Sequence, residues 1–266
     1  MNTEAISVRS RAVAEQETTR FIYVFMAVLF VVVAVAGFAP RSVAIVMGER
    51  PVPQLIVHLH AAMMSAWLVL FLAQTLLMAS GRAAVHRSLG MASFVIAPAM
   101  FFTMAALVIG NFSGTIAAVA DPAAAIPAEA AGRAFAFQIF IMSRALILFG
   151  LFYAWAVLTR KTDRETHKRM MVLATFIVID ASLGRMTWLP GTSGGNFFGS
   201  AGGYDATHLY QLLLLVPVLV YDIVRFKRVH WAYVLGLALF LSCVVGAHFA
   251  WNSPAWHAMV VGLAGG

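Results

Sequence analysis

Long apolar segments are the feature that most restricts how this chain folds. Seven segments are each about 20 residues long, the length that a helix needs to cross the hydrocarbon core of a bilayer. They cover residues 21–38, 55–79, 91–111, 135–158, 170–188, 208–224 and 231–250. Backbone groups in lipid must bond within their own segment, which favours helices in runs of this length. We therefore predict an all-α polytopic membrane helix bundle of about seven transmembrane helices.

The composition agrees with a membrane protein. Hydrophobic residues make up 62% of the chain and charged residues 11%, whereas soluble domains carry roughly 25% charged residues. The single cysteine, Cys243, excludes an internal disulfide and a thiolate cluster. The net charge is +7, but the basic residues lie between apolar segments and not on one soluble face. We therefore expect no nucleic-acid partner.

The basic residues between the segments predict the topology. Alternate connections, starting with the N-terminal tail, hold thirteen of them: Arg9, Arg11, Arg20, Arg82, Arg87, Arg160, Lys161, Arg164, Lys168, Arg169, Arg225, Lys227 and Arg228. The other connections hold three, namely Arg41, Arg50 and Arg133. By the positive-inside rule the N-terminus is cytoplasmic and the C-terminus lies outside. We predict a bacterial inner-membrane protein with a cytoplasmic tail (1–20), a transmembrane domain (21–250) and an outer tail (251–266).

Two ionisable residues lie well inside the predicted helices. Arg144 and Asp180 are each about 12 Å below the outer surface, at 1.5 Å of rise per residue. Their helices are joined by a short connection and are expected to be neighbours. We predict an Arg144–Asp180 ion pair. One interpretation is that the pair only holds the two helices together, and the other is that it forms a proton or anion site.

Further polar residues are predicted in the outer half of the bundle. His58 and His60 are about 200° apart around their helix, so only one faces the bundle. We expect it to be His60. The other members of this predicted outer vestibule are His208, His248, Arg185 and Gln211. Several histidines at one level are typical of a metal, haem or quinone site.

The connection 186–207 is rich in glycine and contains Gly191-Thr192-Ser193-Gly194. No strand precedes it, so it is not a phosphate-binding loop. We expect a connector without regular structure rather than a catalytic serine.

Three stretches carry a resemblance to a known family. They read HLHAAMMSAWLVLFLAQ (58–74), GRAAVHRSLG (81–90) and DRETHKRMMVLATF (163–176). Together they resemble a family of bacterial multi-pass membrane proteins, a resemblance that brings no activity with it. More loosely, histidines at helix ends are similar to those of small membrane cytochromes and oxidase-assembly proteins. Those cytochromes hold haem between histidines of facing helices, which implies pairing of His60 with His208 or His248.

Two hypotheses are consistent with these residues, and they leave open whether the chain is an enzyme. In the first, the chain is a redox protein that binds haem b or a metal ion through His60, His208 and His248. Arg144 and Asp180 then support the site or relay protons. In the second, it is a non-enzymatic carrier, receptor or assembly subunit that binds a small molecule or a partner membrane protein.

Overall fold

The computed structural model describes residues 3–121, 123–124, 126–190 and 206–264, and side chains from residue 21 onward. The predicted connector around 191–205 lies outside the described residues. The regular elements of the described part are helices, which confirms the all-α bundle. They are α1 Thr3–Val46, α2 Leu55–Ala79, α3 Ala83–Gly90, α4 Ser93–Ala120, α5 Ala128–Phe137, the π-helix η1 Gln138–Ser143, α6 Arg144–Thr159, α7 Arg164–Ile177, α8 Asp180–Leu183, α9 Thr207–Leu213, α10 Val216–Phe226, α11 Trp231–Asn252 and α12 Pro254–Ala264.

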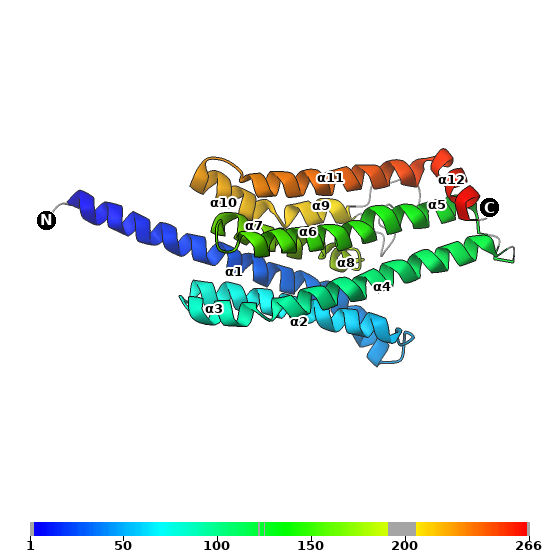
Figure 1. Cartoon of the computed structure of the whole chain (residues 1–266), viewed down its shortest axis with the longest axis horizontal. Helices are drawn as coiled ribbons and strands as arrows, with labels where there is room; N and C mark the ends of the chain where they lie inside the picture. The colour runs from blue at the N-terminus through cyan, green and yellow to red at the C-terminus, as the bar shows by residue number, and fades with distance from the viewer. Residues whose placement is uncertain (1–2, 122, 125, 191–205, 265–266) are drawn as a thin grey trace.

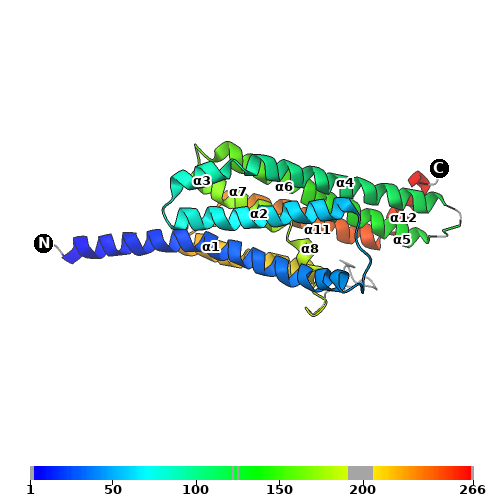
Figure 2. The same cartoon turned by 90° about the horizontal axis from the view of Figure 1, so that it is seen from below.

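The long helices lie along one common axis (Figure 1). The N-terminal part of α1 projects beyond one end of the bundle, and the C-terminal helix α12 lies at the other end (Figures 1 and 2). Most of the predicted outer tail (251–266) is helical, because it contains α12, which packs against α5. The bundle has two recognisable sides, with α1, α2 and α4 on one and α10 and α11 on the other.

Six helical segments of the described residues are long and apolar enough to cross a membrane. They are Phe21–Val46, Leu55–Ala79, Ser93–Ala120, Ala128–Thr159, Thr207–Phe226 and Trp231–Asn252. Each corresponds to one of the predicted apolar segments, as expected of a multi-pass membrane protein. The prediction of about seven spans differs from this count by one segment, 170–188.

That segment is broken in the structure. Helix α7 ends at Ile177 after 14 residues, which is about 21 Å of helix. The amides of Val178 and Ile179 bond to carbonyls three residues back rather than four. Residues 177–179 are all β-branched, which lowers their helix propensity. A new helical turn, α8, starts at Asp180.

Helix α7 is the central element of the core. Residues 172–177 are at most 1% exposed, and α6, α1 and α11 pack around the helix. Helix α8 is held against α1 by a close backbone approach at Gly37. A Cβ at this position would lie closer than 3.0 Å to the carbonyl oxygen of Ser182, so only glycine fits. The broken helix therefore sits inside the bundle, enclosed by helices that face the surroundings.

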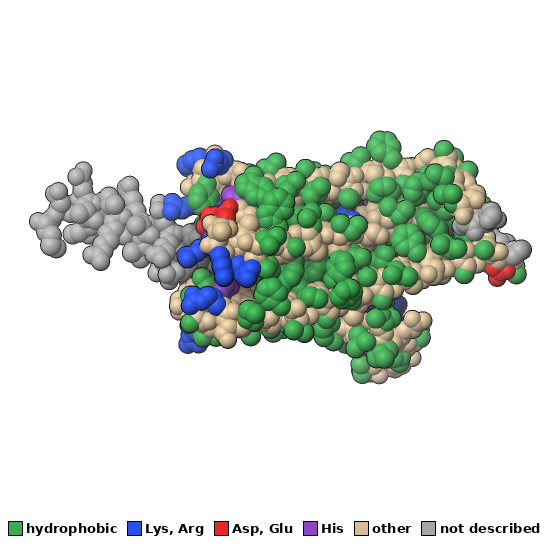
Figure 3. All heavy atoms as spheres, in the orientation of Figure 1, with side chains coloured by type: hydrophobic (Ala, Val, Ile, Leu, Met, Phe, Trp, Pro, Cys, Tyr) green, Lys and Arg blue, Asp and Glu red, His purple; other side chains and the backbone are tan. Residues whose placement is uncertain are grey.

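The surface of the bundle has a long apolar zone with charge at one end. Large apolar side chains such as Phe102, Val69 and Phe249 are more than 60% exposed, which is unusual on a soluble monomer. Lys and Arg gather at the end from which α1 projects, here called the basic end (Figure 3). Its exposed members lie in the turns around α3, α7 and α10: Arg82, Arg87, Arg160, Lys161, Arg164, Arg225, Lys227 and Arg228.

Candidate functional site

The structure contains the ion pair predicted between Arg144 and Asp180. Nη2 of Arg144 lies 2.5 Å from Oδ2 of Asp180, and the two side chains are 0% and 6% exposed. The pair links the first residue of α6 to the first residue of α8. Since 16 residues of α6 separate it from the basic end, it lies about 24 Å from that end.

Irregular backbone places both partners of the pair. The π-helix η1 ends at Ser143, whose hydroxyl donates to the carbonyl of Gln138 at 2.8 Å. A π-turn adds a residue to the helix and rotates the residues after it, and such turns are frequent at functional sites. On the facing side, Asp180 comes directly after the break between α7 and α8. Its Oδ1 accepts a hydrogen bond from the amide of Ala181 at 2.7 Å.

The Arg144 guanidinium is only partly satisfied by protein groups. Its centre lies 4.7 Å above the ring of Phe240 on α11. Asp180 binds Nη2, whereas Nε and Nη1 are buried without a hydrogen-bond partner among the residues that the structure describes. A buried guanidinium nitrogen without an acceptor costs about 1–3 kcal/mol or more. The arrangement therefore offers two donors to an acceptor that the described residues do not supply.

Helix α9 brings two more polar side chains to the same place. His208 is 1% exposed, and its ring lies edge-on to Phe240 with 5.9 Å between centroids. Gln211 is fully buried, and its Nε2 donates to the carbonyl of Phe176 at 2.9 Å. That carbonyl is in the last turn of α7, next to the break. Gln211 therefore secures the end of the broken helix.

Arg185 completes the group. Its guanidinium lies 4.6 Å from the ring of Phe38 on α1, bonds to the carbonyl of Ala181 and interacts electrostatically with Asp180. We refer to Arg144, Asp180, Arg185, His208, Gln211 and Phe240 as the Arg144 site. Sequence reasoning proposed five of these residues. It missed Phe240, whose apolar side chain gives no signal in an apolar helix.

The three histidines predicted as ligands lie in different surroundings. His60 faces the bundle and His58 is exposed, as predicted, but Nδ1 of His60 lies 3.2 Å from the Thr103 hydroxyl of α4. His208 packs on Phe240, and His248 is exposed beside Phe249. His60 thus contacts α4, His208 contacts α11, and His248 lies on the exposed surface of α11. Within the described ranges, no three His, Cys, Asp or Glu side chains are grouped to hold a metal ion.

A second buried ion cluster lies toward the basic end, and sequence reasoning missed it. Arg169 donates to both carboxylate oxygens of Asp222, from Nε at 3.1 Å and from Nη2, and both side chains are 0% exposed. Nη1 of Arg169 also pairs with Glu165 at 2.6 Å. The amide of His230 donates to Asp222 at 3.0 Å. The cluster joins α7 to α10 and to the start of α11.

Two expectations from sequence are corrected here. The sequence predicts Arg169 in a connection and only Arg144 and Asp180 as ionisable residues well inside helices, whereas Arg169 lies in α7 and Asp222 in α10. Asp222 lies inside the segment 208–224, two residues from its end, and its position in an apolar segment is the available signal. Burial opposes ionisation of Glu165, but hydrogen bonds from Lys168 and Arg169 outweigh burial and lower the pKa of this carboxyl. Burial and then the charge of Arg169 lower the pKa of His230.

No protein-family model, curated protein or solved structure matches the chain. The resemblance to a family of bacterial multi-pass proteins therefore stays a prediction.

Proposed function

We propose that this protein is a membrane carrier that binds a small anion at Arg144, with Asp180 as the counter-ion that the anion displaces. The observation that carries the proposal is the fully buried guanidinium of Arg144, which has one nitrogen paired and two without a described acceptor. A guanidinium binds carboxylate or phosphate oxygens through two parallel hydrogen bonds. A small carboxylate is the anion that we expect.

Displacement of Asp180 couples the anion to a proton. The carboxyl is 4% exposed, and an unpaired charge in such surroundings costs several kcal/mol. A displaced Asp180 is therefore more stable protonated than ionised. One proton should accompany each anion that binds, which makes the Arg144 site a coupling centre of a carrier.

We further propose that the chain lies in the bacterial inner membrane, with the basic end in the cytoplasm and the C-terminus outside. The gathering of Lys and Arg at one end supports this orientation, because positively charged turns are retained in the cytoplasm. The Arg144 site then belongs to the outer half of the bundle. A carrier fits the geometry better than the redox hypothesis, because His60 contacts α4, His208 contacts α11 and His248 is exposed.

The test uses the purified full chain in liposomes that contain a pH-sensitive dye. A set of small carboxylates, inorganic phosphate and chloride is added outside. We expect internal acidification with a carboxylate and its loss in Arg144→Gln. In Asp180→Asn the anion should still bind, as measured by calorimetry, without proton uptake.

Two further variants make the result decisive. Arg133→Gln is the matched control, because Arg133 forms a more exposed ion pair with Glu129. The double variant Arg144→Gln with Asp180→Asn removes both charges, so no charge is left buried without its partner. Its monodispersity in detergent shows whether the chain folds without the ion pair. The proposal fails when the wild type shows no anion-dependent proton uptake, or when Arg144→Gln transports like Arg133→Gln.

A further inference from the structure

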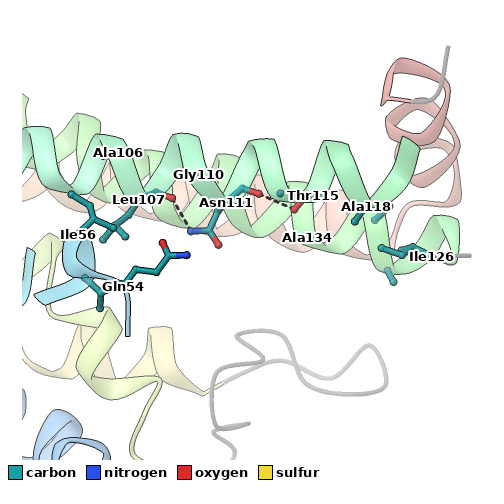
Figure 4. Close-up of a pocket in the computed structure, with 14 residues that line it drawn as sticks. Gln54, Ile56, Ala106, Leu107, Gly110, Asn111, Thr115, Ala118, Ile126 and Ala134 are labelled. Atoms are coloured by element: carbon teal, nitrogen blue, oxygen red, sulfur yellow. Dashed lines mark hydrogen bonds between the residues drawn. The ribbon is translucent and has the colours of Figure 1, made fainter. Parts of the chain in front are cut away.

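A groove of 630 Å³ lies between the start of α2, the C-terminal half of α4 and α5. Figure 4 shows it running along α4, with Gln54 at one side and Ile126 near its far end. It is separate from the Arg144 site, whose residues do not line it. The volume falls within the range of small-molecule sites, about 300–1,000 Å³.

The floor of the groove is flat because α4 has small residues at every fourth position. Gly110 and Gly114 are one turn apart on the same face, and Ala106 and Ala118 extend the row in both directions. A Cβ added at either glycine would meet nothing within 4 Å. This face of α4 is therefore open and accommodates a planar group in contact with the helix backbone.

Three polar and uncharged side chains line the otherwise apolar groove, namely Gln54, Asn111 and Thr115. The amides of Gln54 and Asn111 point toward each other across it in Figure 4. Gln138 of η1 donates from Nε2 to the backbone carbonyl of Asn111 at 3.1 Å and to the Thr115 hydroxyl at 2.7 Å. Gln138 does not itself line the groove, and its two hydrogen bonds hold the Asn111 backbone and the Thr115 hydroxyl in place. Nδ2 of Asn111 donates one N–H to the Leu107 carbonyl at 2.7 Å, so the wall offers the second N–H of Asn111 and the amide of Gln54.

The groove opens toward the apolar surroundings of the bundle. Ile109 and Ile116, which flank the row of small residues, are 63% and 44% exposed, and α4 is one of the membrane-spanning candidates. A ligand that dissolves in the bilayer therefore reaches the groove sideways. Among the described lining residues none is charged, so the groove does not match a phosphate headgroup, which prefers Arg or Lys.

We propose that this groove binds a neutral, lipid-soluble molecule with a flat head that carries carbonyl or hydroxyl oxygens, the chemistry of a quinone or quinol. The glycine floor fits the ring, and the amides of Asn111 and Gln54 donate to carbonyl oxygens. Small residues four apart also mediate packing between transmembrane helices. Association of two copies of the chain is therefore a separate outcome of the test.

The test measures binding of a benzoquinone with a decyl tail to the purified full chain in neutral detergent, by equilibrium dialysis. Gly114→Leu fills the groove without a clash, and we expect it to weaken binding at least tenfold. Asn111→Leu should weaken binding severalfold. Gly262→Leu is the matched control, because a Cβ at Gly262 in α12 also meets nothing within 4 Å, and it should bind like the wild type.

Several results would overturn the proposal. One is absence of saturable quinone binding, and another is equal binding by Gly114→Leu and Gly262→Leu. Preferential binding of phosphatidylglycerol over the quinone would assign the groove to phospholipid. Sedimentation that shows a dimer lost only in Gly114→Leu, without quinone binding, would assign it to helix packing. Arg144→Gln should leave quinone binding unchanged, so this proposal and the carrier proposal fail independently.

Discussion

Replacing Asp222 by alanine tests whether the buried ion cluster near the basic end holds α7 in place. Asp222 accepts two hydrogen bonds from Arg169 and one from the amide of His230. Its removal leaves Arg169, whose side chain is 0% exposed, with Glu165 as its remaining acidic partner. Breaking a buried pair by removing one partner costs about 3–5 kcal/mol. Because Glu165 remains, we expect about 3 kcal/mol, the lower end of that range.

The free energy of unfolding is measured in mixed detergent micelles by the loss of helical circular dichroism with increasing denaturing detergent. Asp121→Asn is the control, since Asp121 is exposed and accepts one local hydrogen bond from the amide of Ala123. Its expected effect lies within about 0.5 kcal/mol of zero. A double variant, Arg169→Met with Asp222→Leu, replaces the pair with apolar side chains of similar size. It should be more stable than Asp222→Ala alone, because no charge is left buried without its partner.

Two results would refute this reasoning. A loss below about 1 kcal/mol in Asp222→Ala would mean that water or Glu165 satisfies Arg169 as well as Asp222 does. A double variant that is less stable than Asp222→Ala would mean that the pair stabilises the fold by more than its desolvation costs. The first result would mean that Asp222 is not needed to hold α7 in place, and the second would contradict the argument from desolvation.

Three further predictions concern other parts of the molecule. Gly37→Leu should destabilise the fold by about 1–3 kcal/mol or more in the same unfolding assay, because its Cβ would clash with the Ser182 carbonyl, whereas Gly262→Leu should not. The pKa of Glu165 is lowered on folding, so its stabilising contribution is complete above its unfolded value of about 4.3 and is lost as the pH falls through the lower folded value; unfolding of wild type and Glu165→Gln measured from pH 6 to pH 3 should therefore converge at the acid end. The purified protein should show no haem absorption band, and a Soret band that disappears in His60→Ala would restore the redox hypothesis.

The sequence predicted the fold well where the physics is local to one segment. Segment length against bilayer thickness identified the six long helices. Depth along the helix and a short connection predicted the Arg144–Asp180 pair. These inferences need only the rise per residue and the cost of charge in an apolar environment.

The features that the sequence did not predict depend on how each helix is rotated about its axis and on where helices are broken. A pairing of His60 with His208 requires both rings to face the same cavity. Which way each ring faces depends on how α2 and α9 pack: His60 contacts α4 and His208 contacts α11. A straight helix over 170–188 was expected from apolarity alone, whereas β-branched residues 177–179 and the buried Asp180 favour a break. The apolar segment starts after Arg169 and so predicts a connection at this residue, whereas α7 already begins at the Asp163 cap.

The backbone around the Arg144–Asp180 pair bears on which interpretation of that pair is right. Two straight helices can hold an ion pair at matching depth without any irregularity. Here the π-helix η1 ends directly before Arg144, and the break between α7 and α8 ends directly before Asp180. Irregular backbone at membrane depth weakens the helix ladder and is tolerated only where protein or a cavity satisfies it. Gln211 supplies part of that satisfaction through the Phe176 carbonyl. A pair that only fastened two helices would need neither irregularity, so their coincidence favours a site at which Arg144 and Asp180 exchange partners.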